Sequence, residues 1–492
     1  MKKINKKDII IFSIMLIITL IIFSKYLTGY FATDTYSIYL RGYEDYAIKN
    51  SLNDGRIIMG LIGILANMIN IPIKIYTIIL ITLSLVTSCF SIMILKNMIL
   101  ELKDAKSKVV AFLVTIISYY TIFNFMYIEN LGFVECFVMA LSILFYLLAT
   151  KNLITQNKKS YIKATIFLIL GVMSYQGTIS MYFLSVFVFS ILKEENIKNI
   201  AKNIVICIVM AIVAVIVNYL EIKLVGQIFG TNQTRTSGFS NLKNNIIYII
   251  NNSRRAIIYT GSLLPQYWYL GFLSIIETVV IIKSIIQKNP YIIMEQLMII
   301  IVSIILGFII SVIDLSGFWS GRIRFSIGAT IGFLFLHLYV KTNWLEEEKI
   351  SNNILIVIFL VYGIINTVTY INVTNIGKMV NELDQKISEE IKQYMIQYEE
   401  QTNIKVTKIA IINGGSTIKA YYKELGYKGA VPTTSAVRTS WAVRGIINYY
   451  TQKELEEVSV NKKQEEYYIE NVDKNKEYMC VEDTLYITSY MY

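Results

Sequence analysis

The sequence predicts an all-α polytopic membrane protein with about 10–12 membrane helices and a small C-terminal α/β domain. Hydrophobic residues make up 55% of the 492 residues and charged residues 16%, whereas a soluble domain is about 45–50% apolar and about 25% charged. Several apolar runs approach about 20 residues, the length that crosses a bilayer. Charge also divides the chain: the net charge is +11, but the segment from Val373 onward holds 15 Lys and Arg against 17 Asp and Glu.

The excess of positive charge therefore belongs to the predicted membrane domain, residues 1–372. Positive cytoplasmic loops and anionic lipid explain it, so a lipid bilayer is expected as a partner and a nucleic acid is not. Three of the four cysteines fall in apolar segments and Cys480 stands alone in the tail, so neither a disulfide framework nor a zinc spacing is present. The abundance of Ile, Lys and Asn suggests a bacterial source.

The first apolar segment, Asp8 to Phe23, follows four lysines. It resembles a signal peptide, but no small-residue cleavage site follows, so we interpret it as a retained anchor. The positive flank places the N-terminus in the cytoplasm.

The loop at 25–56 is predicted to be the first outer loop. Its charged residues lie among seven aromatic ones, a mixture typical of the membrane surface. Asp34 comes about ten residues after the anchor, so its carboxylate can act on a lipid head group as a general base; a helix N-cap or turn residue is the alternative. Arg56 follows the turn residues Asp54 and Gly55, and its guanidinium suits phosphate.

The apolar residues 57–71 either span the bilayer or lie in its interface. Spans are predicted at 75–95, 109–127 and 131–149, the last two joined by the three-residue hairpin Ile128–Asn130. If 57–71 lies in the interface, the lysine-bearing loops 96–108 and 150–163 both face the cytoplasm, as the positive-inside rule prefers. Glu129 in the hairpin then lies on the outer side with Asp34, where it either ends a helix or positions an acceptor or a divalent metal.

The apolar run 161–192 is too long for one ordinary span and is interrupted by Ser174-Tyr-Gln-Gly-Thr178. We interpret it as two short helices joined by a polar break. Tyr175 and Gln176 then bond neighbouring helices or contact sugar and phosphate. If this run is a pair of short helices, the tail emerges on the outer side. If the run crosses the membrane once, the tail is cytoplasmic.

Further spans are predicted at about 200–224, 267–286, 291–313, 322–341 and 352–372, with a polar loop of about 30 residues after Leu224. Arg322 and Arg324 open one of these spans, either as interfacial anchors or as a clamp for lipid phosphate. Arg254 and Arg255 are weaker candidates for the same role. His337 is expected to be a packed helix residue.

The tail, 373–492, is predicted to be a small extracytoplasmic α/β domain. An exposed helix is expected at 376–401, a strand at 406–412, helices after Asn413-Gly-Gly-Ser416 and over 435–450, and short strands at 478–488.

Four short motifs occur in an order that resembles that of membrane glycosyltransferases of the GT-C fold. The motifs themselves resemble those of the bacterial Gtr-type, serotype-converting glucosyltransferases. They are Thr33-Asp34-Thr35, Asp54-Gly55-Arg56, Glu129-Asn130 and Tyr175-Gln176-Gly177, all within the first 190 residues. By the resemblance, Asp34 matches the catalytic acid of the first outer loop and Glu129 the acid of the second. The loop has no Asp-Asp pair, so the resemblance leaves a divalent metal open.

The resemblance implies transfer of a hexose, such as glucose, from a polyprenyl-phosphate donor to a cell-envelope glycan acceptor at the bacterial cytoplasmic membrane. The acceptor hydroxyl attacks, phosphate leaves and Asp34 takes the proton. A transporter or flippase for lipid-linked sugars is a second interpretation, since it also predicts broken helices. A polymerase or ligase that uses the same lipids is a third.

Overall fold

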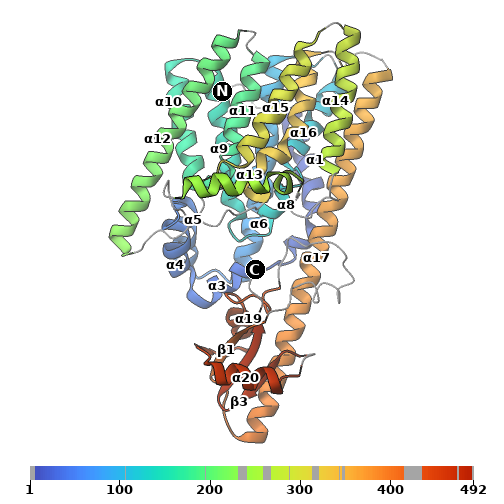
Figure 1. Ribbon diagram of the computed structural model, residues 1–492. Helices are drawn as coiled ribbons and strands as arrows, with labels where there is room; N and C mark the ends of the chain where they lie inside the picture. The colour runs from blue at the N-terminus through green and yellow to red at the C-terminus, as the bar shows by residue number, and fades with distance from the viewer. Residues whose placement is uncertain are drawn as a thin grey trace.

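The computed structural model describes residues 6–105, 107–193, 196–230, 241–258, 268–287, 289–312, 321–342, 344–345, 350–414, 435–473 and 476–489. Within them it is a mostly helical protein with six helices long and apolar enough to cross a membrane, followed by a small mixed four-stranded sheet with helices (Figure 1). The predicted fold class is confirmed. The chain is a multi-pass membrane protein.

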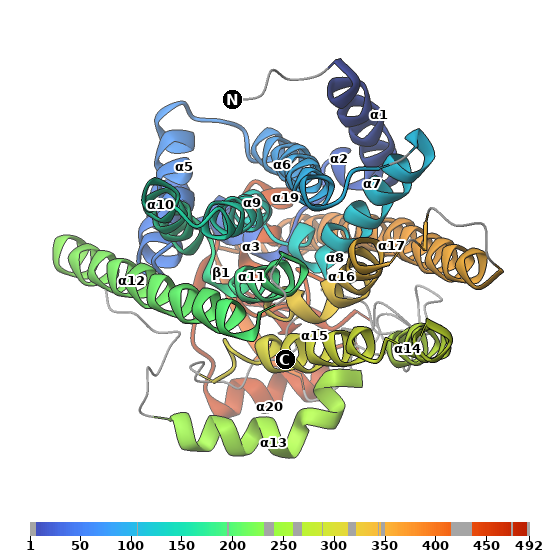
Figure 2. The ribbon, with the colours of Figure 1, turned by 90° about the horizontal axis from the view of Figure 1, so that it is seen from above.

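The first half of the bundle contains the most buried of the six long apolar helices. It consists of α1 (Lys6–Ile22), α6 (Ile73–Leu102), α7 (Lys108–Ile122), α9 (Cys136–Ile154), α10 (Lys158–Ser174) and α11 (Ser180–Lys193). Helix α9 packs against α6, α10 and α11, which Figure 2 shows end-on. Of the apolar window at Gln176–Lys193, 83% is buried, so α11 is a core helix.

The second half consists of α12 (Ile197–Phe229), α14 (Trp268–Gln287), α15 (Tyr291–Gly307), α16 (Phe325–Lys341) and α17 (Ile350–Thr402). Every residue from Phe325 to Tyr339 is buried, because α16 lies between α7, α11 and α15. Only 28% of the α12 window is buried, so α12 presents its apolar side chains outward, as a helix in lipid does. Where the polar loop after Leu224 was expected, the chain continues α12 and then forms α13 (Leu242–Ile258).

Ion pairs identify one end of the bundle. Lys96 binds Asp8 at 2.8 Å, Lys151 binds Glu101 at 2.8 Å, and Lys193 Nζ donates to the Ile154 carbonyl at 2.5 Å. The last contact shows that the run 158–193 leaves this end and returns to it, with η2 (Gln176–Thr178) between α10 and α11. The prediction of two short helices and a polar break is confirmed.

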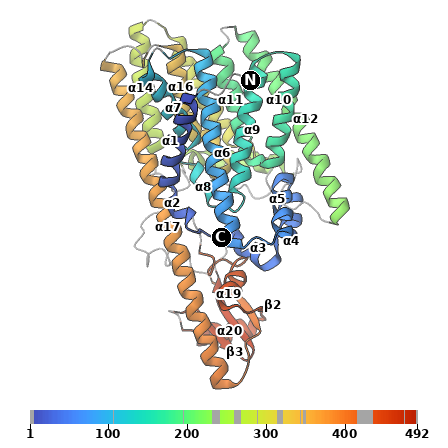
Figure 3. The same ribbon diagram turned by 180° about the vertical axis from the view of Figure 1, so that it is seen from behind.

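The first loop and the tail lie at the opposite end of the bundle, as Figure 3 shows. The lysine pattern and the broken run at 161–192 together predict this relative sidedness of the first loop and the tail, and it is present. Which end faces the cytoplasm stays a prediction.

Short elements fill the first loop: α2 (Ser24–Leu27), α3 (Thr33–Arg41), α4 (Tyr43–Tyr46), the π-helix η1 (Ala47–Leu52) and then α5 (Ile57–Met68). The twelve residues of α5 extend about 18 Å, which is too short to cross the roughly 30 Å hydrocarbon core. This length agrees with the interfacial alternative for 57–71.

The predicted three-residue hairpin at 128–130 is wrong. Helix α7 ends at Ile122, where the Asn124 amide donates to the Thr121 carbonyl at 3.0 Å, and α9 begins only at Cys136. The buried connection between them contains α8 (Tyr127–Leu131), whose Tyr127 hydroxyl bonds Ser88 at 2.6 Å. Its apolar residues pack inside the bundle, so hydrophobicity alone extended the predicted spans too far.

The C-terminal sheet has the strand order β2-β1-β4-β3. Strand β1 (Lys408–Asn413) pairs in parallel with β2 (Glu456–Val458) and β4 (Thr484–Ser489), and β3 (Tyr478–Val481) pairs antiparallel with β4. Helices α19 (Val443–Thr451) and α20 (Lys462–Asn471) complete this part. The helix expected after Asn413-Gly414 lies outside the described residues, and the one expected at 435–450 begins at Val443.

Helix α17 runs without interruption through the predicted domain boundary at residue 373. Its lower part is the helix expected at 376–401, but it is exposed on one side only, because Ile391 and Met395 on the other side are fully buried in the core of the tail. One helix thus connects the membrane bundle to the tail.

Candidate active site

Asp34 lies in the first turn of α3 and is partly buried. The N-cap of α3 is Ala32, so the alternative that Asp34 is an N-cap is wrong. A carboxylate in the first turn interacts favourably with the positive end of the helix dipole. Asp34 therefore lies at the positively polarised end of α3.

A small open hollow lies at the start of α3. Its walls include Tyr30 and Thr35 from the first loop and Leu131 and Phe133 from the connection between α7 and α9. The Thr35 hydroxyl is buried and has no hydrogen-bond partner within the described structure. An unsatisfied hydroxyl in such a wall is costly unless a ligand or water bonds it.

Glu129 lies on α8, next to Asn130, whose amide is fully buried and has no partner among the described residues. A side chain added at Gly321 would collide with the Glu129 carboxylate, so η3 (Gly321–Ile323) lies directly against it. The sequence did not indicate this approach of residues almost 200 positions apart.

The two predicted arginines differ in their surroundings. The Arg322 guanidinium carbon lies 3.8 Å from the centroid of the Phe133 ring, a cation–π contact, and the side chain is partly exposed. Arg324 is fully buried at the start of α16. Arg322 thus lies beside the wall of the hollow, whereas Arg324 is closed off from solvent.

The hollow thus joins three segments: Thr35 follows Asp34 on α3, Leu131 lies on α8 with Glu129, and Phe133 contacts Arg322. The opening of both carboxylates onto one cavity stays a prediction.

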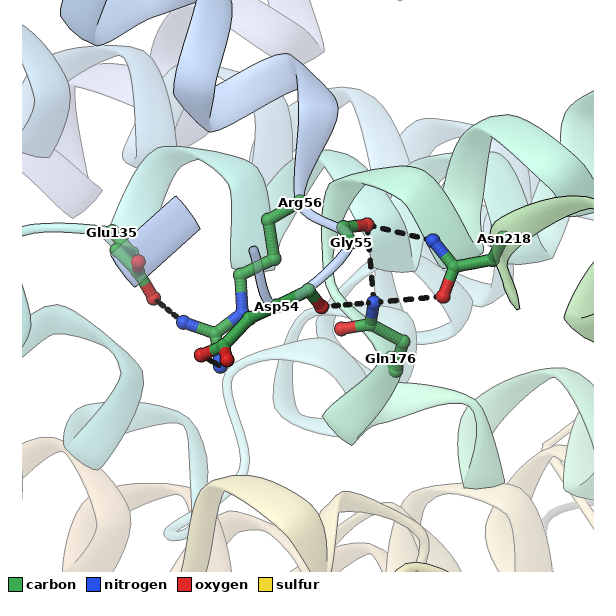
Figure 4. A network of polar contacts seen from close by, with 6 residues as sticks. All are labelled: Asp54, Gly55, Arg56, Glu135, Gln176 and Asn218. Carbon is green, nitrogen blue, oxygen red and sulfur yellow. Dashed lines mark hydrogen bonds and ion pairs between the residues drawn. The ribbon is translucent and has the colours of Figure 1, made fainter. Parts of the chain in front are cut away.

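Arg56 belongs to a separate buried network (Figure 4). Its guanidinium forms an ion pair with Glu135 and lies 3.6 Å from Asp54, and it stacks on the Tyr175 ring at 5.1 Å. Burial alone would lower the pKa of Arg56, but Glu135 and then Asp54 outweigh it, so the pKa is raised and the charge is kept. Arg56 is 9% exposed. Its positive charge is already compensated by protein carboxylates.

Gln176 extends this network to α12. Its Nε2 donates to the carbonyls of Asp54 at 2.9 Å and Gly55 at 3.1 Å, and to Asn218 Oδ1 at 3.1 Å. Asn218 Nδ2 in turn donates to the Gly55 carbonyl at 2.7 Å and to Glu221 at 2.9 Å. Of the two interpretations of Gln176, bonding between structural elements is the one that the contacts favour.

Sequence reasoning missed Glu135, Asn218 and Glu221. A signal was present, because each is a polar side chain within an apolar run, and such residues pair inside membrane proteins. Their partners could not be chosen from the sequence, since the partners come from distant segments.

His337 is packed, as expected. It is fully buried, its Nε2 lies 2.7 Å from Glu295, and its Nδ1 lies 3.3 Å from the Gln296 amide. Glu295 also pairs with Lys341 at 3.2 Å. Arg254 and Arg255 belong to α13, and their side chains lie outside what the structure describes.

Among the described residues, no three His, Cys, Asp or Glu side chains come together in a way that could hold a metal ion. A divalent metal therefore stays a prediction for which the described residues provide no set of ligands. A comparison with protein-family models and with curated proteins finds no match to this chain. The family resemblance rests on the four short motifs alone.

Proposed function

We propose that the protein is a membrane glycosyltransferase that moves a hexose, such as glucose, from a polyprenyl-phosphate donor to a cell-envelope glycan. One observation carries the proposal: the helices that bear Asp34 and Glu129 form walls of one hollow through Thr35 and Leu131, and Arg322 packs on Phe133 of the same wall. The donor's lipid tail stays in the bilayer while its sugar reaches this end.

In this proposal Asp34 takes the proton from the acceptor hydroxyl as that oxygen attacks the sugar carbon. The bond to phosphate breaks, and Arg322 neutralises the charge that builds on the leaving phosphate. Glu129 positions the acceptor. A single displacement of this kind inverts the sugar carbon.

In this proposal a positioning role, and not direct contact with the substrate, falls to Arg56, Tyr175 and Gln176. Their polar groups bond one another, Glu135 and the backbone of residues 54–55. They hold the end of the loop that carries Asp34. The buried Arg324 supports the start of α16 beneath Arg322.

The test uses purified protein, synthetic polyprenyl-phosphate hexose and an envelope glycan acceptor. Asp34→Asn keeps the shape of the side chain but removes its basicity, so transfer should fall about 10²–10⁴-fold. The matched control is Asp45→Asn, because Asp45 is an acid of the same loop whose only task visible in the structure is an exposed pair with Lys49 at 2.6 Å. Full turnover by Asp34→Asn would refute the base role.

Arg322→Ala should raise the donor concentration needed for half-maximal rate, since Arg322 is proposed to hold the lipid phosphate. Arg41→Ala, which removes an exposed arginine from the end of α3, is the control. If the wild type transfers no sugar but moves the lipid across liposomes, the transporter interpretation replaces this one. Extension of a repeating glycan would favour a polymerase or ligase.

A further inference from the structure

Helix α13 runs across the bundle instead of along it. Figure 1 shows it lying horizontally over the front of the other helices, and Figure 2 shows it at full length along the rim. Its 17 residues extend about 26 Å in this direction. A helix in this orientation lies parallel to the membrane plane rather than through it.

One polar contact fixes the level of α13. Asn245 is buried, and its Nδ2 donates to the Val312 carbonyl at 3.0 Å, just beyond the end of α15. That end of α15 is where Ser303 accepts from Ser326 at the start of α16. Helix α13 therefore lies at the end of the bundle that bears η3 and the first loop.

Four apolar side chains of α13 lie outward. Ile246, Ile247, Tyr248 and Ile250 are 40–65% exposed, beside the exposed polar residues Lys243, Asn244 and Asn251, while Asn245 points into the protein. Large apolar side chains exposed next to one another are unfavourable in water. Apolar and polar side chains exposed on one helix suit the boundary between acyl chains and head groups.

The charge of α13 has one sign. The helix carries Lys243, Arg254 and Arg255 and no acidic residue. We propose that α13 is seated in the surface of the bilayer, with its apolar side chains among the upper acyl chains and its basic residues drawn to anionic phospholipid head groups. The partner is the lipid leaflet itself, and the seating does not depend on sugar transfer.

Depth-dependent fluorescence quenching tests the position. Bimane is attached to Ile250→Cys in the full chain in vesicles of phosphatidylcholine and phosphatidylglycerol that contain lipids labelled with a nitroxide quencher. The four native cysteines are buried, so the unsubstituted protein gives the background. Ile212→Cys, an outward position midway along α12, and Trp441→Cys, an exposed position in the tail, mark the hydrocarbon core and water.

A quencher near the head group should quench position 250 more than one near the end of the acyl chain, with the reverse order at position 212 and little quenching at 441. Stronger quenching of position 250 by the deep label, or no quenching at all, would overturn the surface seating.

A second arm tests the charge. Labelled phosphatidylglycerol should quench position 250 more than identically labelled phosphatidylcholine, and the combined change Lys243→Gln, Arg254→Gln and Arg255→Gln should remove this difference. Substitution of Lys158, Lys159 and Lys163 by Gln, at the other end of the bundle, should leave the difference in quenching between the two lipids unchanged. Equal quenching by the two lipids in the wild type would contradict the anionic preference.

Discussion

The segment that carries Asp34 is held at two places by contacts of different kinds. At its start, α3 packs against α19 of the tail: Phe31, Tyr36 and Tyr39 surround the Tyr449 ring with centroid distances of 5.0–6.0 Å. Asn381 on α17 also bonds both backbone groups of Phe31, at 2.7 and 2.9 Å. At its end, residues 54–56 are held by the buried ion pair of Arg56 with Glu135 and by the amides of Gln176 and Asn218.

These two attachments should respond differently to change. When apolar or aromatic packing is truncated, the stability lost is in proportion to the contact that is lost. When one partner of a buried ion pair is removed, the loss is larger, because an uncompensated charge is left in a medium of low dielectric constant. The end of the loop should therefore tolerate substitution less well than its contact with the tail.

The largest effect is expected at Glu135→Ala. The change leaves Asp54, at the longer distance, as the carboxylate partner of the buried Arg56, so stability should fall by about 3 kcal/mol, the lower end of the range for a broken buried pair. The apparent melting temperature in detergent measures it. Glu101→Ala is the control, since it breaks a pair with Lys151 that is largely exposed and worth about 1 kcal/mol or less. Equal losses in the two variants would contradict the contrast.

A smaller effect is expected at Gly445→Ala on α19. The added Cβ would collide with the Tyr36 carbonyl, so α3 and the tail must separate, at a cost of about 1–3 kcal/mol. Gly271→Ala in α14 meets no atom within 4 Å, and alanine favours a helix over glycine, so this control should keep or raise the melting temperature. An unchanged melting temperature in Gly445→Ala would mean that the contact with the tail does not contribute to stability.

The smallest effect is expected at Asn381→Ala. It removes two hydrogen bonds to the Phe31 backbone, each worth about 1 kcal/mol net, in a partly buried place where water can replace them. Limited trypsin cleavage at Arg41 should accelerate as α3 loosens, with little change in melting temperature. Gln385→Ala, one turn further along α17, removes a bond to the exposed Glu389 and should cleave at the wild-type rate. If cleavage accelerated equally in Gln385→Ala, the faster cleavage could not be attributed to the loss of the Asn381 bonds to Phe31.

Much of the architecture followed from local sequence. Long apolar runs must become helices in a bilayer, because their backbone groups have no water to bond. Helix α10 ends where the polar residues Tyr175 to Thr178 interrupt an otherwise continuous apolar pattern. The same interruption made the break predictable from the sequence. The strand at β1 and the helix entering the tail were also visible in the periodicity of their own residues.

The tertiary structure alone decided which polar groups meet. Nothing local to Arg56 selects Glu135, 79 positions away, and nothing local to Gln176 selects the carbonyl of Gly55. The connection between α7 and α9 shows the same limit: its residues are apolar enough to extend two spans, yet Tyr127 and Asn124 find partners that make it a buried link. Hydrophobicity determines that a residue leaves water, but the geometry of the packed helices determines what it contacts there. For this reason the sequence predicted the membrane helices, whereas the partners of Arg56 and the contact of α3 with the tail depended on the fold.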